Sequence, residues 1–193
     1  MDRRGTAGGD VVANPTEVRP SEETKAGPGG YPGPWTGYGA SPREMPLTGY
    51  AALLAAYAGL FGTAVSVAAS RRGLPERIAA GDVLLFGVAT HKIGRIVTRD
   101  WVTSPVRAPF TEYQASVGGG EVTERSRGEG LPRAIGDLLT CPWCIAPWVA
   151  GTLYTMFLVK PAAARLVAAA FSSVALSDVL QHAYSALRTL PRK

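Results

Sequence analysis

The feature that most constrains this 193-residue chain is a pair of long segments without a charged side chain. One runs from Leu47 to Ser70 and the other from Leu138 to Val159. A stretch of about 20 apolar residues crosses the hydrocarbon core of a bilayer as an α-helix. Inside lipid every backbone amide needs a partner within the protein, which a helix supplies. We therefore expect an all-α integral membrane protein.

The sequence between and after these segments predicts further helices. A second helix should follow Pro75 and end near Thr98. Its apolar centre is short, and it reaches the length of a span if His91, Lys92 and Arg95 lie in its last turns, because Lys and Arg side chains extend to the headgroups. The third helix should start between Cys144 and Pro147 and end at Val159, and a fourth is expected over Ala162 to about Leu187.

The polar segments complete the expected organisation. Residues 1–46 mix Gly, Pro and both charge signs without periodicity, which predicts a disordered tail. The loop of residues 100–137 holds prolines, three consecutive glycines and alternating charges, so it should lie outside the membrane. Residues 188–193 form a short basic tail. The membrane domain then covers residues 80–187, with 47–70 as an additional transmembrane helix.

The distribution of Lys and Arg predicts the orientation. If four helices span, then the N-terminal tail, the 100–137 loop and the C-terminus share one side, which carries most of the 20 Lys and Arg residues. Cytoplasmic loops are enriched in these residues, so both termini and the loop are expected in the cytoplasm. The net charge of +5 is explained by this placement beside apolar segments, and no nucleic-acid partner is expected.

The two cysteines lie in the motif Cys141-Pro142-Trp143-Cys144, at the start of the second apolar segment. Their spacing places both sulfurs within reach of each other or of one metal ion. A helix N-terminus favours the thiolate form. Because cytoplasmic thiols are kept reduced, we expect a free dithiol rather than a structural disulfide.

Three interpretations of this motif stay open. The cysteines form a packed interfacial corner with Trp148, or they are the catalytic thiols of a redox protein. In the redox case the chain resembles four-helix membrane thiol oxidoreductases, although it lacks the second cysteine pair that those proteins use. In the third case, Cys141, Cys144, His91 and His182 hold zinc or iron. No other cofactor is expected.

A basic stripe should lie on the second helix, because Lys92, Arg95 and Arg99 recur at helical spacing. Such a stripe either orients the helix at the headgroups or, joined by Arg107 from the loop, binds anionic lipid headgroups. Asp178 on the fourth helix is expected to pair with Arg95 or Arg107, since an unpaired carboxylate near lipid is costly.

Three ordered motifs resemble a bacterial membrane protein family called domain of unknown function 1360. They are HKIGRIVTRD at 91–100, PVRAPF at 105–110, and LLTCPWC at 138–144 with a following Trp148. The resemblance covers about residues 80–187. It implies a compact three-helix membrane core in which the Cys-x-x-Cys opens a helical hairpin, and it implies no particular reaction.

Together these patterns favour a small bacterial inner-membrane, multi-pass protein that acts as a non-enzymatic interaction or accessory component. The expected partners are the bilayer, including anionic headgroups, and a second copy or another membrane protein. The alternatives are the thiol-redox and metal-binding proteins described above.

Overall fold

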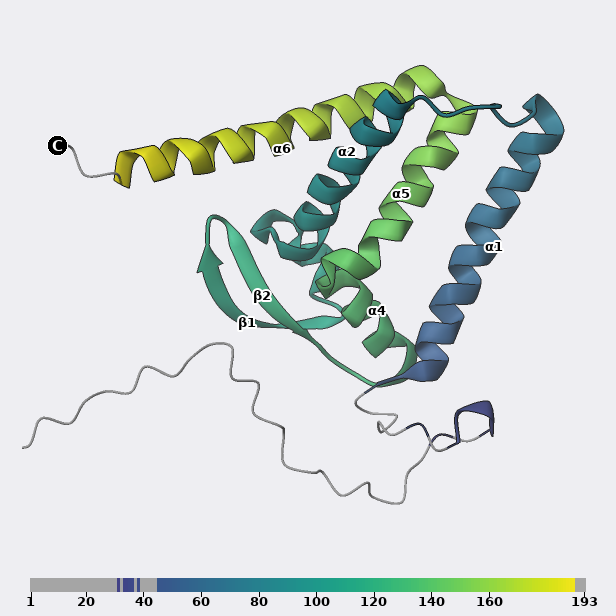
Figure 1. Cartoon of the computed structure of the whole chain (residues 1–193). Helices are drawn as coiled ribbons and strands as arrows, with labels where there is room; N and C mark the ends of the chain where they lie inside the picture. The colour runs from purple at the N-terminus through teal and green to yellow at the C-terminus, as the bar shows by residue number, and fades with distance from the viewer. Residues whose placement is uncertain (1–30, 32, 37, 39–44, 190–193) are drawn as a thin grey trace, which may run out of the picture. The chain divides into compact units, whose positions relative to one another are not determined.

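Alanine-rich apolar sequence forms three long helices in the described part of the chain, which comprises residues 31, 33–36, 38 and 45–189. In this computed structural model they are α1 (Leu47–Arg72), α5 (Pro142–Val159) and α6 (Pro161–Thr189) (Figure 1). All three are long and apolar enough to cross a membrane, judged by length and composition. Their bounds agree closely with the predicted helices.

The chain divides into two units, Met1–Ser41 and Pro42–Lys193. In the first, the described residues include a short 3-10 turn at Gly33–Trp35. The predicted disordered tail of residues 1–46 and the basic tail of residues 188–193 lie mostly outside the described residues.

The second helix, α2 (Ala80–Arg99), begins later than predicted. Gly73 follows α1 with φ 73°, and Pro75 favours extended backbone in the residue before it, so the connecting segment does not join the helix. Asp82 and the three basic residues of its second half make α2 more polar than the other long helices. For this reason α2 is not among the candidate spans that the described residues contain.

Helix α6 runs beside α2 in the same direction. Three polar contacts join the two helices in the same order along both: Arg165 with Asp82, Ser172 with the Leu85 carbonyl, and Lys92 with Asp178. Arg165 donates to both carboxylate oxygens of Asp82, at 2.8 and 2.7 Å. The contacts therefore set the register between α2 and α6.

The buried apolar core lies where α2, α5 and α6 meet. Its fully or nearly buried members are Phe86, Ala89, Leu153, Phe157, Ala164 and Ala168. The ring of Phe86 meets those of Tyr154 and Phe157 edge to face, with centroids 5.1 and 5.4 Å apart. Alanine on α6 lets the neighbouring backbones approach, and aromatic rings from α2 and α5 fill the remaining space.

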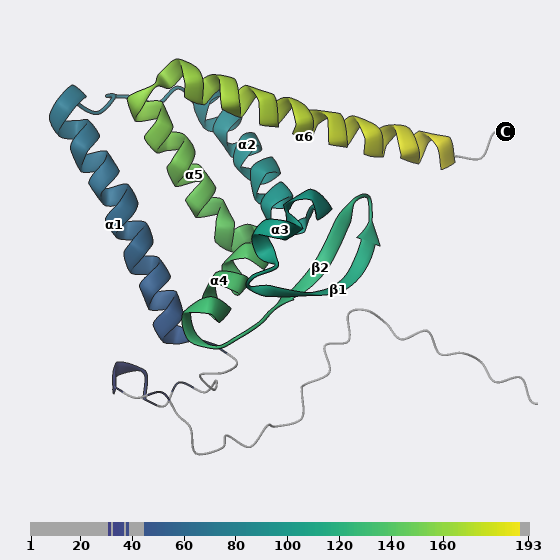
Figure 2. The same ribbon diagram turned by 180° about the vertical axis from the view of Figure 1, so that it is seen from behind.

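Residues 100–140, which we call the cap, connect α2 to α5. The cap contains a 3-10 turn (Trp101–Thr103), α3 (Ser104–Arg107), the antiparallel strands β1 (Thr111–Gly118) and β2 (Glu121–Ser126), and α4 (Gly130–Thr140). Figure 2 shows α3 beside the end of α2, with the hairpin next to it. The described part of the chain is mostly helical, as predicted, and the hairpin is its β-structure.

The hairpin turn explains why this region is more ordered than the expected loop. Gly118, Gly119 and Gly120 have φ values of 85°, 61° and 80°, a conformation that residues with a Cβ rarely adopt. The sequence predicts these glycines as part of the loop of residues 100–137. Here they reverse the chain tightly and let the flanking segments pair.

Candidate functional site

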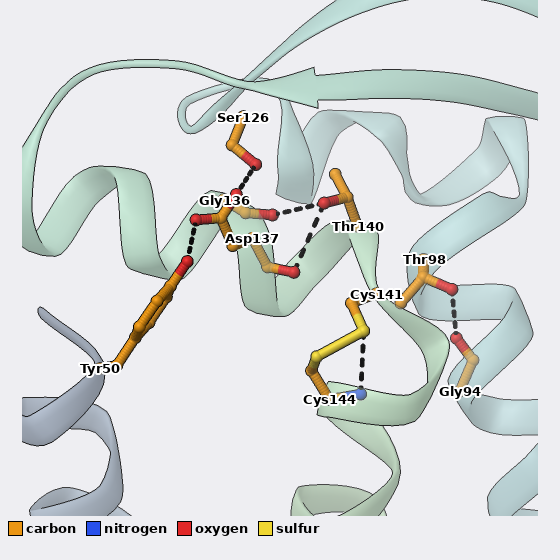
Figure 3. Close-up of a disulfide and its surroundings, with 9 residues drawn as sticks. All are labelled: Tyr50, Gly94, Thr98, Ser126, Gly136, Asp137, Thr140, Cys141 and Cys144. Atoms are coloured by element: carbon orange, nitrogen blue, oxygen red, sulfur yellow. Dashed lines mark hydrogen bonds between the residues drawn. A yellow bond between two sulfur atoms is a disulfide. The ribbon is translucent and has the colours of Figure 1, made fainter. Parts of the chain in front are cut away.

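The cysteine motif joins the cap to α5. Cys141 lies between α4 and α5 in extended backbone, and its Sγ accepts a hydrogen bond from the Cys144 N–H at 3.2 Å (Figure 3). The two cysteines form a disulfide, with their Cα atoms 5.2 Å apart. The expectation of a free dithiol was therefore wrong for this structure. The extended backbone at Cys141, followed directly by the first turn of α5, brings the sulfurs within bonding distance, whereas the expectation rested only on the compartment.

One turn before the cysteines, Asp137 joins α1, α4 and β2. Its carboxylate accepts hydrogen bonds from the Tyr50 hydroxyl at 2.7 Å and the Ser126 hydroxyl at 2.6 Å (Figure 3). Arg133 donates to the same carboxylate at 3.2 Å. These contacts attach the first helix to the family-like part of the chain, and Asp137 had no role in the sequence analysis.

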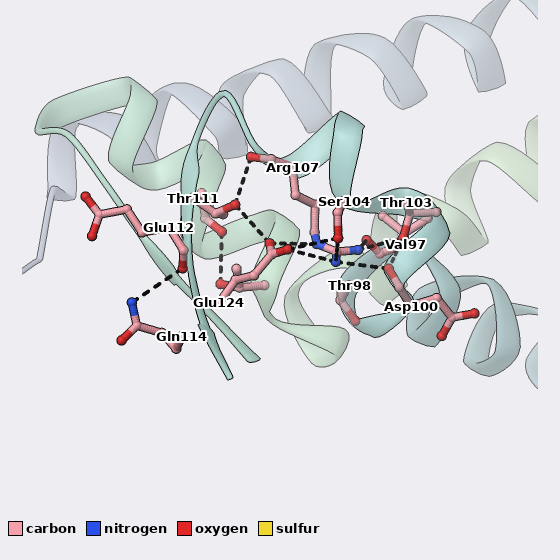
Figure 4. Close-up of polar contacts among 12 residues, drawn as sticks. Val97, Thr98, Asp100, Thr103, Ser104, Arg107, Thr111, Glu112, Gln114 and Glu124 are labelled. Carbon is pink, nitrogen blue, oxygen red and sulfur yellow. Dashed lines mark hydrogen bonds and ion pairs between the residues drawn. The ribbon is translucent and has the colours of Figure 1, made fainter. Parts of the chain in front are cut away.

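The centre of the cap is a buried ion pair between Arg107 and Glu124. The Arg107 side chain is fully buried and that of Glu124 is 6% exposed. The guanidinium donates to both carboxylate oxygens, at 2.8 and 3.0 Å, and its other donors reach the Val97 and Asp100 carbonyls and the Thr103 hydroxyl (Figure 4). Such a bidentate pair, with its remaining donors satisfied, ties α2, α3 and β2 together.

The Glu124 carboxylate is stabilised in its charged form. Burial alone would raise its pKa, but hydrogen bonds from Arg107, Thr111 and Ser104, with the attraction of the Arg107 charge, hold the pKa below its ordinary value of 4.5. The Thr111 hydroxyl lies 2.9 Å and the Ser104 hydroxyl 3.2 Å from the carboxylate oxygens. Glu124 is thus a charged group at neutral pH.

The predicted basic stripe is divided among different partners. Lys92 Nζ lies 2.7 Å from Asp178 Oδ2, and Arg95 pairs with Glu121 at the start of β2. The prediction that Asp178 pairs with Arg95 or Arg107 was wrong. Lys92 is the basic residue of α2 that faces α6, whereas Arg95, one turn further along, faces the hairpin.

A groove of about 1490 Å³ lies between α2, α6 and the tip of the hairpin. We call it the α2–α6 groove. One part of its lining is apolar, from residues such as Val83 and Leu176, and another part carries His91, Lys92 and His182. The predicted lipid-binding cations that line it already have carboxylate partners. An anionic headgroup would therefore have to displace a carboxylate to bind here.

The predicted metal ligands are only partly brought together. His91 and His182 line the α2–α6 groove, while Cys141 and Cys144 do not. Among the residues that the structure describes, no group of three or more His, Cys, Asp or Glu side chains is arranged to hold a metal ion. The zinc or iron site stays a prediction.

The residues that the sequence analysis missed, Glu124 and Asp137, are carboxylates in a segment interpreted as a loop. In the sequence, Glu124 stands next to Arg125, and Asp137 follows Arg133 by four residues. Charged residues on exposed strands and helices often have the same spacing, so the sequence does not mark these two carboxylates as special. Only the fold shows that Glu124 pairs instead with the distant Arg107.

The cap, the disulfide and most of the residues that line the α2–α6 groove fall within a segment that known proteins share. A family model described as "Protein of unknown function (DUF1360)" matches residues 85–184. Sporulation protein YjcA of Bacillus subtilis (strain 168) is 28% identical over 102 residues, which make up 51% of this chain and 86% of that protein. No solved structure matches the chain. Because the family model covers more than half of the chain, this protein belongs to the DUF1360 family of proteins of unknown function.

Proposed function

We propose that this chain is a small multi-pass protein of a bacterial inner membrane that acts as a non-enzymatic interaction or accessory component. The observation that carries the proposal is the apolar surface left uncovered on the long helices. Leu54, Leu60 and Leu166 are 70%, 59% and 72% exposed, on α1 and α6. Surfaces of this kind are costly in water and suited to lipid hydrocarbon.

The cap supports the interaction part of the proposal. Its central ion pair, Arg107–Glu124, is almost completely buried, so this pair does not depend on a ligand to neutralise it. Its outer surface presents Trp101, Val102 and Val106, which are 53%, 79% and 62% exposed. Exposed Trp and Val at this position fit a protein partner or the headgroup layer.

Two measurements test the proposal. We expect the full chain to stay in the membrane fraction after alkaline carbonate extraction, whereas a peripheral protein would be released. For orientation, a Ser116→Cys variant in a Cys141→Ser, Cys144→Ser background places a single thiol on the exposed strand β1. A membrane-impermeant maleimide should label it only after the membrane is permeabilised. Release by carbonate would contradict membrane insertion. Labelling in intact spheroplasts would contradict the expected cytoplasmic location of the 100–137 loop and therefore of the cap.

The disulfide favours one second candidate, a thiol-redox protein centred on Cys141 and Cys144. In that reaction a thiolate of a partner dithiol attacks one sulfur and releases the other as a thiolate. The partner's second thiolate then resolves the mixed disulfide, so that this chain gains two electrons and two protons and the partner becomes a disulfide. Disulfides persist in oxidising compartments, so this candidate predicts a cap outside the cytoplasm.

The labelling experiment also separates the two candidates. Alkylation in intact cells followed by mass spectrometry reads the state of the cysteine pair directly. A cytoplasmic cap with fully free thiols would exclude the redox candidate, while an external cap with a mixed disulfide to a second protein would favour it over the accessory role.

A further inference from the structure

A second groove, of about 510 Å³, lies between α1 and α5 at the end of these helices away from the cap. We call it the α1–α5 groove. Small residues of α1, among them Gly59, Thr63 and Ala68, form one wall, and Leu158 of α5 contributes to the other. A Cβ added at Gly59 would meet no atom within 4 Å. The gap is therefore not closed by packing.

Aromatic contacts close the space between the same two helices nearer the cap. The rings of Tyr57 and Phe61 on α1 both meet Trp148 of α5 edge to face, with centroids 5.4 and 6.1 Å apart. Phe61 also covers Gly151, where a Cβ would come within 2.8 Å of the ring. The groove therefore begins beside this aromatic contact, at Gly59, and continues to the end of α1.

Two arginines lie at the far end of the groove, and its lining contains no acidic residue. Arg72 donates one hydrogen bond to the Val159 carbonyl at the C-terminus of α5, which places its guanidinium beside the groove. A guanidinium has five donors, so most of those on Arg72 stay available. Arg71 lies beside it and is exposed. This cationic end contrasts with the α2–α6 groove, whose lining cations are already paired with carboxylates.

We propose that the α1–α5 groove binds an anionic phospholipid, with an acyl chain along α1 and the phosphate between Arg71 and Arg72. The helix from Gly59 to Arg72 is about 20 Å long, at about 1.5 Å per residue. One leaflet of hydrocarbon is about 15 Å thick. An acyl chain of that leaflet therefore fits the apolar part and leaves its headgroup at the arginines. Arginine binds phosphate oxygens through paired donors.

The groove is too small to enclose a whole helix, so a packed helix would enter it only with one row of side chains. A helix about 10 Å in diameter and 20 Å long fills roughly 1,600 Å³, about three times the groove. The inference rests on the proposed insertion of α1 and α5 into a membrane.

Native mass spectrometry of the delipidated full chain tests this binding, with phosphatidylglycerol and phosphatidylcholine of identical acyl chains as probes. We expect the wild type to retain phosphatidylglycerol preferentially. Each arginine beside an anionic headgroup contributes about 5-fold, so Arg71→Gln with Arg72→Gln should lower the preference about 25-fold. Arg71→Lys with Arg72→Lys should keep most of it. Arg77→Gln, an exposed arginine outside the groove, is the matched control and should change nothing.

A variant that fills the groove tests the acyl-chain position. Gly59→Leu should reduce retention of both lipids, whereas Gly87→Leu, at another glycine with open space around it, should leave α1–α5 binding unchanged. Equal retention of the two lipids by the wild type, or an unchanged preference in the double Gln variant, would overturn the inference. So would a dimer that Gly59→Leu disrupts while lipid retention stays the same.

Carbonate extraction of the same samples separates this inference from the proposed function. Release from the membrane means that the membrane function itself fails. A chain that resists extraction but shows no headgroup preference means that only the lipid site fails.

Discussion

The cap and the helical core are stabilised by opposite means. The core where α2, α5 and α6 meet is built from alanine and aromatic side chains, and its outer surface stays apolar. The cap is built around the buried Arg107–Glu124 pair and the Asp137 hydrogen bonds. The proposed membrane location would account for this difference, because a surface in lipid needs no polar partner, while a module of about 40 residues in water is too small to rely on apolar burial alone.

The largest expected effect comes from breaking the cap's ion pair. Arg107→Met leaves the Glu124 carboxylate buried without its cation, and we expect the free energy of unfolding of the cap to fall by about 3–5 kcal/mol. Hydrogen exchange of the hairpin amides measures this locally. Arg125→Met removes an exposed pair with Glu112 and should cost less than about 1 kcal/mol. Equal losses in the two variants would contradict the central role of Arg107.

The same centre should make the cap sensitive to acid. The pKa of Glu124 is lower in the folded chain than its ordinary value of 4.5, so its charge stabilises the cap above pH 4.5. This stabilisation is lost as the pH falls from 4.5 through the folded pKa. Tryptophan fluorescence during acid titration should therefore show cap opening in that range, before the helices unfold. Glu124→Gln should remove this transition and Glu112→Gln should keep it.

Close packing inside the cap gives the next effect. A Cβ on Gly136 would lie 2.5 Å from the Phe110 carbonyl oxygen and 2.8 Å from the Ser126 Cβ. We expect Gly136→Ala to destabilise the cap by about 1–3 kcal/mol, measured by thermal unfolding. Gly87→Ala in α2 meets no atom and should be neutral or stabilising by up to about 1 kcal/mol. A destabilised Gly87→Ala would show that the helical core is packed as tightly as the cap.

The disulfide lies at the boundary between the two regions, and its reduction should have an intermediate effect. The chain-entropy model gives about 2 kcal/mol for so short a loop. Cys141→Ser should lose this amount but keep an acceptor for the Cys144 N–H, whereas Cys141→Ala should lose about 1 kcal/mol more through the missing helix cap. Identical melting temperatures for the two variants would argue against the capping role of the sulfur.

The smallest effect is expected for the partly exposed pair between Lys92 and Asp178, whose side chains are 13% and 40% exposed. Lys92→Met should lower stability by up to about 1 kcal/mol. Exchanging the charges, with Lys92→Asp and Asp178→Lys, should restore the loss. The same exchange between Arg95 and Asp178 should not, because Arg95 pairs with Glu121. If the Arg95 exchange did restore stability, it would support the Arg95–Asp178 pair expected from the sequence and contradict the Lys92–Asp178 pair.

The long helices could be predicted because their signal is local. Apolar segments of sufficient length favour helices, and the bounds of α1 and α6 and the end of α5 follow directly. The apolar segment that starts at Leu138 is divided at Cys141 between α4 and α5. The membrane insertion of these helices stays a proposal. The predicted start of α2 was too early, because Pro75 was interpreted as the opening of the helix. In the structure Pro75 lies in the segment before the helix, which begins at Ala80.

The candidate site was harder to predict, since its contacts join residues far apart in sequence. Arg107 was singled out as a lipid ligand, and only the hairpin, which pairs β1 with β2, brings Glu124 to it. The register of α6 on α2 likewise decides that Lys92, rather than Arg95, meets Asp178. The spacing of basic residues within one helix does not predict which carboxylate on another element each of them will pair with.

The contact between Asp82 and Arg165 has a consequence for biosynthesis. The two residues are 83 positions apart, so α2 leaves the ribosome well before its partner on α6 exists. Under the proposed membrane insertion, a helix with a lone carboxylate near its start is held poorly by hydrocarbon, so α2 would have to wait at the insertion machinery or the membrane surface until α6 arrives. Truncated chains that end before Arg165 should accordingly be substrates for membrane quality control.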